Sequence, residues 1–232
     1  MNLRSSSPRP FKRYKVRGNK GVVVGWLLFL LAGIAALFWR YEWVYSLPTP
    51  VPAAYRDVKP GVRIGLPEDQ LALIRMSGPA QESLGQSSAK RPVFLHFFNP
   101  DCPCSRFNMP HFKALVKLYD RQVDFAIVLM TDKKYTAGQI RDKFDLPYPI
   151  PVLTDSALAA ACGVYSTPQA VIIDSTQKLF YRGNYNRSRY CSDEKSSYAK
   201  MALEGLLQNN LTQNFSPLAL KAYGCQLPTC TR

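Results

Sequence analysis

Two cysteines separated by one proline, Cys102-Pro103-Cys104, are the residues of this sequence best suited to chemistry. They follow an apolar run that predicts a buried strand and precede a periodic stretch that predicts a helix. At the start of a helix, unpaired backbone N–H groups and the helix dipole stabilise a thiolate, the form that attacks disulfides. The pattern therefore favours redox chemistry over the alternative, in which the cysteines fill the core as small apolar residues.

A second marker is the segment Ser166-Thr167-Pro168, which opens the apolar run at 169–174. A proline at the start of an apolar strand cannot donate a ladder hydrogen bond, so it needs a special geometry. From base rates alone the Thr167-Pro168 bond would be trans, because only ~5–6% of such bonds are cis in folded proteins.

Hydrophobic periodicity predicts the elements that must position these residues. Their order is β-α-β-α followed by β-β-α, which implies an α/β fold with a mixed sheet and helices on both faces. The predicted strands cover 93–98, 123–130, 150–153, 169–174 and 179–182, and the predicted helices cover 67–75, 105–120, 137–144, 156–161 and 193–208.

Both markers resemble the thioredoxin superfamily, and most closely its membrane-anchored TlpA and ResA branch of thiol-disulfide oxidoreductases. The resemblance spans about residues 90–210 and is carried by FLHFFNPDCPCSRF (94–107) and GVYSTPQAVIID (163–174). Pro110 adds to it, because it lies eight residues after Cys102, where the family has a helix-kinking proline. The resemblance implies a thioredoxin-like fold.

The resemblance also implies roles for individual residues. Pro168 is expected to be cis and to pack beside the cysteines. The backbone of Thr167 is expected to pair with an extended substrate, as in strand addition. Apart from the resemblance, the hypothesis of a thiol-disulfide oxidoreductase assigns the attack to Cys102 and resolution of the mixed disulfide to Cys104.

The family's usual Trp-Cys-X-X-Cys reads Asp101-Cys102-Pro103-Cys104-Ser105 in this sequence. Ser105 therefore stands at the position of the resolving cysteine, and Cys104 comes one residue early. The negative charge of Asp101 opposes formation of a thiolate, and Arg106 is a candidate to offset it.

The favoured hypothesis is a membrane-anchored oxidoreductase that acts on protein thiols and disulfides and exchanges electrons with a membrane donor or acceptor. It needs no cofactor or metal. One alternative is a copper-binding module, since Cys102 and Cys104 offer soft thiolate ligands for Cu(I). His96 and His111 do not match the downstream histidine of copper-delivery proteins of this fold, and we interpret them as a packed residue and a helix-face residue. Two others are a scaffold that has lost catalysis and a peroxiredoxin-like peroxidase, which the sequence fits poorly.

Four further cysteines, Cys162, Cys191, Cys225 and Cys230, are candidates for two structural disulfides in an oxidising compartment. Four cysteines allow three connectivities, one of which closes a local loop between Cys225 and Cys230 and leaves Cys162 with Cys191. In another interpretation, one of the four resolves a mixed disulfide on Cys102. Gly224-Cys225 weakly resembles the Gly-Cys that some thioredoxin-like redoxins carry near the C-terminus.

Residues 21–39 are uncharged and predict a transmembrane helix about 28 Å long at ~1.5 Å per residue. A cleaved signal peptide is the alternative, but this run is longer than usual and ends in large residues. The tail at 1–20 carries seven basic and no acidic residues, which places it in the cytoplasm and residues 40–232 outside. We expect a bacterial inner membrane with a periplasmic domain; a mitochondrial inner membrane has the same pattern.

The predicted organisation has five parts. Five prolines between 48 and 67 predict a stiff extended spacer at 46–67. The net charge of +14 is partly due to the tail, and no basic run is interleaved with aromatics, so nucleic-acid binding is not expected. The parts are a basic tail (1–20), an anchor (21–39), a spacer with an N-terminal extension (40–90), a thioredoxin-like domain (91–210) and a cysteine-containing extension (211–232).

Overall fold

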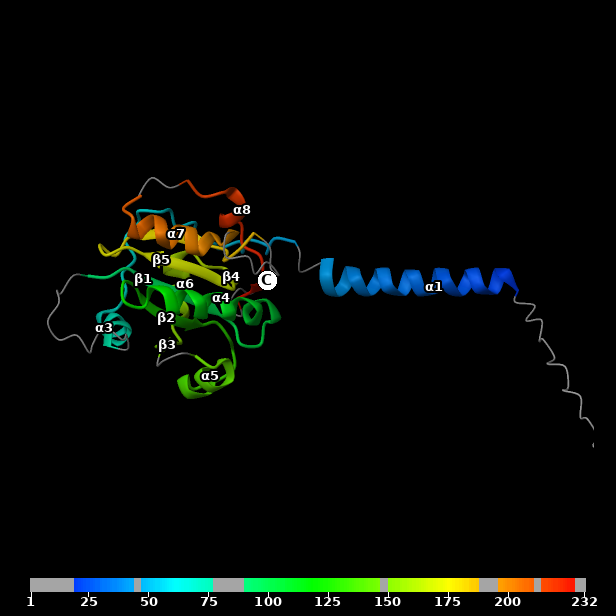
Figure 1. Ribbon diagram of the computed structural model, residues 1–232, viewed down its shortest axis with the longest axis horizontal. Coiled ribbons are helices and arrows are strands. Elements are labelled where there is room, and N and C mark those ends of the chain that lie inside the picture. Colours follow the sequence, from blue (N-terminus) through cyan, green and yellow to red (C-terminus); the bar gives the residue numbers. More distant parts are fainter. Residues whose placement is uncertain are drawn as a thin grey trace, which may run out of the picture. The chain divides into compact units, whose positions relative to one another are not determined.

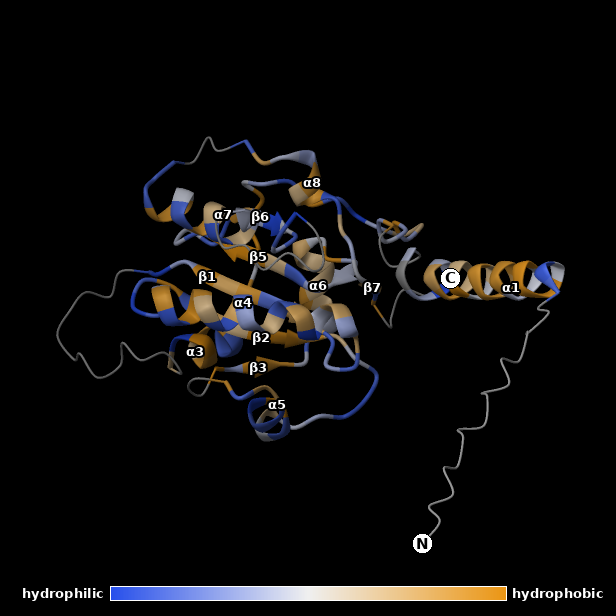
Figure 2. Ribbon diagram, turned by 45° about the vertical axis from the view of Figure 1, so that its right-hand side comes forward, coloured by the Kyte–Doolittle hydropathy of each residue, from blue (hydrophilic) through white to orange (hydrophobic). Residues whose placement is uncertain are grey.

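The computed structural model describes residues 19–43, 47–76, 90–146, 150–187, 196–210 and 214–227. The chain forms two units, Met1–Val44 and Tyr45–Arg232. In the first, α1 (Lys20–Phe38) is followed by the π-helical turn η1 (Trp39–Trp43). The span Lys20–Tyr41 is long and apolar enough to cross a membrane, and none of its residues is buried. Figure 2 shows this helix as mostly hydrophobic along its length.

The second unit is built on a five-stranded sheet of order β3-β2-β1-β5-β6 (Figure 1 and Figure 2). The strands β1, β2 and β3 run parallel, whereas β5 is antiparallel to both β1 and β6. The predicted mixed sheet, including its terminal hairpin, is therefore confirmed. The bounds are β1 (Val93–Phe98), β2 (Asp124–Leu129), β3 (Val152–Leu153), β5 (Gln169–Ile173) and β6 (Leu179–Gly183).

Helices cover both faces of this sheet and bury two hydrophobic clusters against it. Apolar residues of α4 and α7 pack into one cluster, and those of α3 and α6 into the other. Figure 2 shows the hydrophobic strands at the centre and the largely hydrophilic α5. The helices are α3 (Glu68–Met76), α4 (Pro103–Tyr119), α5 (Ala137–Phe144), α6 (Ser156–Cys162) and α7 (Tyr198–Leu207).

Helix boundaries follow local capping chemistry. The hydroxyl of Thr136 accepts a hydrogen bond from Gln139 N and starts α5, while Gly163 ends α6 with a φ of 70°. Helix α7 starts later than predicted, at Tyr198, because Ser197 caps it through Lys200 N. Residues 193–195 of the predicted helix lie outside the described part of the chain.

Residues 47–67, here called the N-terminal strap, form part of the domain. The prediction of a spacer separate from the domain is wrong for this segment, because Val58, Ile64 and Leu66 are buried in the cluster beside α3 and α6. The strap is extended, as its prolines predict, and its backbone bonds to the β5–β6 hairpin. Ile64 N donates to Gln177 O at 2.8 Å, and Leu179 N donates to Val62 O at 2.8 Å.

Residues 214–227, here called the C-terminal segment, also fold onto the domain. The segment contains the short helix α8 (Pro217–Leu220) and the two-residue strand β7 (Cys225–Gln226). Strand β7 pairs antiparallel with β4 (Ser166–Thr167), which directly precedes Pro168. Ser166 lies opposite Gln226, and Thr167 lies opposite Cys225. Strand β7 of the predicted extension thus pairs with the second marker segment.

Candidate functional site

Cys102 is the N-cap residue of α4, with Pro103 at the first helical position. Three backbone N–H groups set the turn that precedes it. Cys102 N donates to Asn99 O at 3.1 Å, and Asp101 N donates to Asn99 Oδ1 at 3.0 Å. Asn99 N donates to Ser105 Oγ at 3.2 Å. Ser105, at the family's resolving position, therefore holds the turn that presents Cys102.

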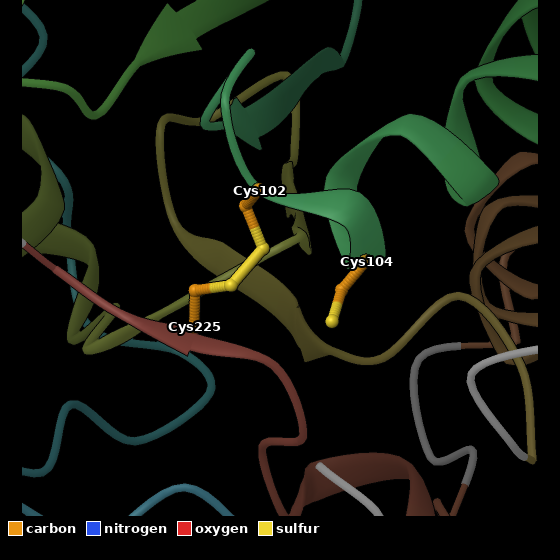
Figure 3. A group of neighbouring side chains, drawn as sticks. All are labelled: Cys102, Cys104 and Cys225. Atoms are coloured by element: carbon orange, nitrogen blue, oxygen red, sulfur yellow. A yellow bond between two sulfur atoms is a disulfide. The ribbon is translucent and has the colours of Figure 1, made fainter. Parts of the chain in front are cut away.

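The Cys102 sulfur is bonded to that of Cys225 on β7, and the two Cα atoms are 6.5 Å apart (Figure 3). The Cys104 sulfur lies within 4.8 Å of both bonded sulfurs. The site therefore brings together the predicted Cys102 and Cys104 with a third sulfur from the C-terminal segment.

This geometry corrects the predicted disulfides. The pairing of Cys225 with Cys230 is wrong here, because β7 lies on β4 and brings Cys225 to Cys102. Cys225 is thus bonded to Cys102, which brings one of the four remaining cysteines to the residue whose mixed disulfide it could resolve. Cys191 and Cys230 lie outside the described residues.

Cys162 is a free thiol at the end of α6, so within the described residues it forms no structural disulfide. It is fully buried in the cluster beside α3 and packs there as a small apolar residue. Burial raises the pKa of this thiol to about 12, so it stays protonated at neutral pH. Cys162 is therefore an inert reference for the chemistry of Cys102.

The Thr167-Pro168 peptide bond is cis, as the resemblance implies. Pro168 lines the same small pocket as Cys104, so the proline does pack beside the cysteine site. The pocket is lined by Cys104, Asn108, Pro168, Asn184, Tyr185, Asn186 and Tyr223.

Asn184, directly after β6, anchors the C-terminal segment. Its amide nitrogen donates to Lys221 O at 2.6 Å and to Leu218 O at 2.9 Å, and its amide oxygen accepts from Tyr223 N at 3.4 Å. One side chain thus fixes three backbone groups that precede Cys225. The sequence carries no motif that would have identified it.

Thr49, on the N-terminal strap, is a second anchor and is buried. Its backbone N donates to Ala222 O at 2.9 Å, and its hydroxyl donates to Gly224 O at 3.1 Å. The hydroxyl also lies 2.9 Å from Ser166 Oγ on β4. Thr49 therefore ties β4 and the C-terminal segment together independently of the disulfide.

The negative charge of Asp101, which is next to Cys102, is compensated by two residues that follow β2. Tyr135 donates a hydrogen bond to its carboxylate at 2.9 Å, and Lys133 lies 3.4 Å away. Partial burial raises the pKa of Asp101, but the hydrogen bonds and charge of Tyr135 and Lys133 outweigh it, and the net pKa is lowered. Arg106, the predicted compensating residue, is exposed on α4, and within the described residues the ion pair of Asp101 is with Lys133 instead.

His96 is a packed residue, as predicted. It is fully buried on β1, stacks on Phe112 at 4.6 Å and lies 2.6 Å from Tyr185 Oη through Nδ1. Burial lowers its pKa to about 3, so the imidazole is neutral at physiological pH. Within the described residues, the sulfur cluster contains no histidine.

Residues 74–229 match the family described as "Domain of unknown function (DUF6436)". The chain belongs to this family. The DUF6436 region covers the sheet, the helices from α4 onward and β7, and so includes all three sulfurs of the site.

The chain is also similar to "Thiol-disulfide oxidoreductase ResA" of Geobacillus thermodenitrificans (strain NG80-2), with 30% identity over 89 residues. That segment is 38% of this chain and 51% of ResA, so the chain spans about half the length of this curated relative.

Two solved structures share the fold of this DUF6436 chain. A hypothetical protein, SMc02350 from Sinorhizobium meliloti 1021, is 17% identical with a TM-score of 0.52, over 75% of this chain and 96% of that one. An uncharacterized conserved protein from Geobacillus kaustophilus is 18% identical with a TM-score of 0.52, over 78% and 97%. With the strand order, the cis-proline and the similarity to ResA, the predicted thioredoxin-like fold and its resemblance to that branch are confirmed.

Proposed function

We propose that this protein exchanges thiols and disulfides with partner proteins and that Cys102 and Cys225 are its redox pair. The observation that carries the proposal is the disulfide between Cys102, at the start of α4, and Cys225, on the strand β7 that pairs with β4 directly before the cis-proline. The similarity to ResA supports the same class of chemistry. This assignment replaces Cys104 with Cys225 as the bonded partner of Cys102.

In the oxidising direction, a partner thiolate attacks the Cys102 sulfur and breaks its bond to Cys225, which leaves as a thiolate. A mixed disulfide then joins the partner to Cys102. A second partner thiolate attacks the partner's own sulfur in that bond and releases Cys102 as a thiolate. The partner ends as a disulfide, and the protein has gained two electrons as a dithiol; the reverse sequence reduces a partner.

The environment of Cys102 favours it as the sulfur that is attacked and released. The start of α4 stabilises its thiolate, and Lys133 offsets the nearby charge of Asp101. Cys104 lies close enough to attack the same disulfide, so we assign it as the accessory thiol of the site.

Variants of the full chain test this function through oxidation of a reduced model protein, with glutathione disulfide present as the oxidant that regenerates the disulfide after each turnover. Cys102→Ser abolishes activity, and Cys225→Ser slows turnover by about tenfold or more because the Cys102–Cys225 disulfide, which accepts the partner's electrons, can no longer form. Cys162→Ser is the matched control and retains activity, because that thiol is buried and protonated. Full activity of Cys102→Ser would contradict the proposal.

A second candidate function is Cu(I) binding by the reduced protein, favoured by the convergence of Cys102, Cys104 and Cys225 within 4.8 Å. Three thiolates form a soft ligand set that suits Cu(I). Copper titration of the reduced chain should then give one tightly bound ion that Cys104→Ser weakens and Cys162→Ser does not. Absence of stoichiometric uptake would exclude it.

We also propose that α1 anchors the protein in the inner membrane, with the domain in the periplasm. The apolar span Lys20–Tyr41 and the basic tail before it support this topology. A disulfide that persists suits the oxidising side of such a membrane. Electrons would pass to or from a membrane-bound redox partner.

A further inference from the structure

Strand β7 occupies the position at which an extended partner would pair with β4. Thr167 lies opposite Cys225 in this antiparallel pair, and Cys225 is the residue bonded to Cys102 (Figure 3). The C-terminal segment thus holds a cysteine in the place that a mixed disulfide with a partner would require. The backbone of β7 therefore indicates which residue types a partner can place next to its cysteine when it pairs with β4.

The residue before this cysteine, Gly224, is under two independent constraints. Its φ is 148°, a backbone conformation that residues with side chains rarely adopt. A Cβ atom there would also lie 2.1 Å from Thr167 O and 2.9 Å from Thr167 C. Both obstacles are backbone atoms of β4, which cannot turn away as a flexible side chain can. Only glycine therefore fits directly before a cysteine in this register.

Contacts other than the disulfide hold β7 and the residues before it in place beside β4. Thr49 bonds to Ala222 O and Gly224 O, and Asn184 bonds to the backbone of Lys221 and Tyr223. A partner strand must displace these contacts to pair with β4. The edge accepts one strand at a time, so β7 and the partner compete.

We propose that the protein binds an extended segment of a partner protein in which glycine directly precedes the reacting cysteine. The segment pairs with β4 in place of β7, and its cysteine becomes bonded to Cys102. This inference rests on the proposed function and adds the sequence class of the substrate.

Three synthetic peptides test the inference. They are identical except that the residue before their single cysteine is glycine, L-alanine or D-alanine. Each peptide carries thionitrobenzoate on its cysteine as a mixed disulfide. The Cys102 thiolate attacks the peptide sulfur, forms the Cys102–peptide disulfide and releases the coloured thionitrobenzoate thiolate. The protein is the full chain with Cys104→Ser and Cys225→Ser, and mass spectrometry verifies that the adduct is on Cys102.

The glycine peptide should react about tenfold faster or more than the L-alanine peptide. Pairing with β4 would force L-alanine into a strained backbone conformation that glycine adopts freely. The D-alanine peptide should recover most of this rate. A D-residue prefers positive φ, and its Cβ does not take the L-position that meets Thr167 O. A general effect of side-chain size would slow both alanine peptides equally, so stereochemistry separates the two explanations.

Equal rates for the three peptides, with the adduct on Cys102, would overturn this inference and leave the proposed function intact. If no peptide formed an adduct on Cys102, and the symmetric disulfide of thionitrobenzoate formed none either, both the inference and the proposed function would be overturned. The wild-type chain provides a second measurement that does not depend on the double variant. When the wild-type chain is incubated with the three peptides as free thiols, the glycine peptide should form the most Cys102 adduct, the D-alanine peptide nearly as much and the L-alanine peptide the least.

Discussion

The surroundings of Cys102 are set by a few residues from the turn before α4, from α4 itself and from the loop after β2. Ser105 appeared from sequence to be a lost catalytic cysteine, but its hydroxyl accepts a bond from Asn99 N and shapes the turn. Asp101 could be identified as an opposing charge because it is adjacent in sequence. Lys133 could not, because only the fold brings the loop after β2 to the start of α4.

Lys133→Ala should raise the pKa of the Cys102 thiol in the reduced protein, because the charge of Asp101 is then less compensated. Asp101→Asn should lower it for the opposite reason. The rate of alkylation of Cys102 as a function of pH measures both shifts. Lys134→Ala is the matched control, since Lys134 is exposed and next in sequence. Identical alkylation profiles for Lys133→Ala and Lys134→Ala would contradict the role of Lys133.

His96 should make the fold sensitive to acid. Its pKa is about 3 in the native state against 6.5 ordinarily, so the unfolded state binds more protons between these values. The free energy of unfolding should therefore fall by about 1.4 kcal/mol per pH unit as pH decreases through this window. Chemical denaturation at several pH values measures the slope, which His96→Asn should reduce. An unchanged slope in that variant would show that other groups cause the acid sensitivity.

At the level of elements, the five central strands and their helices were predictable, because hydrophobic periodicity is a local property. The strap and β7 were not. The prolines around Thr49 indicate extended backbone but do not tell which surface that backbone covers. Strand β7 has only two residues, and its partner β4 lies about sixty residues earlier, so pairing depends on the assembled sheet. The disulfide connectivity was unpredictable for the same reason.

Asn184→Ala should loosen the C-terminal segment, because three backbone groups lose their side-chain partner. The free energy of unfolding should fall by about 1–3 kcal/mol, and the Cys102–Cys225 disulfide should be reduced more readily. Thermal unfolding and titration with dithiothreitol measure these effects. Gln208→Ala, at an exposed position, is the control. Wild-type reducibility in Asn184→Ala would show that this anchor does not hold Cys225 near Cys102.

At the scale of the whole molecule, the chain combines an apolar helix and a domain whose site carries a disulfide. Both units could be predicted from the sequence. The apolar run and the basic tail are continuous in the sequence and identify the helix, and hydrophobic periodicity identifies the domain. The boundary between them was misjudged, because the strap belongs to the domain and contributes Thr49 to the site. A shortened chain that begins after the strap would therefore lack part of the site.

The full chain should stay with the membrane pellet after alkaline extraction, and an alkaline phosphatase fused after Trp43 should be active in a bacterial host. Both results follow from an apolar α1 preceded by basic residues. Replacing the basic residues of the tail with glutamine should lower the phosphatase activity. Release of the wild-type chain into the soluble fraction would argue for a cleaved signal peptide.

The central claim is that Cys102 and Cys225 form the redox-active disulfide, and a redox titration with peptide mapping tests it most directly. The full-length protein is equilibrated at a series of thiol and disulfide ratios, trapped by alkylation, digested and analysed without reduction. We predict that the peptide pair linking Cys102 to Cys225 disappears and returns in one two-electron transition, while Cys162 stays a thiol throughout. A disulfide between Cys102 and Cys104 in the oxidised protein, with Cys225 free to be alkylated, would contradict the account.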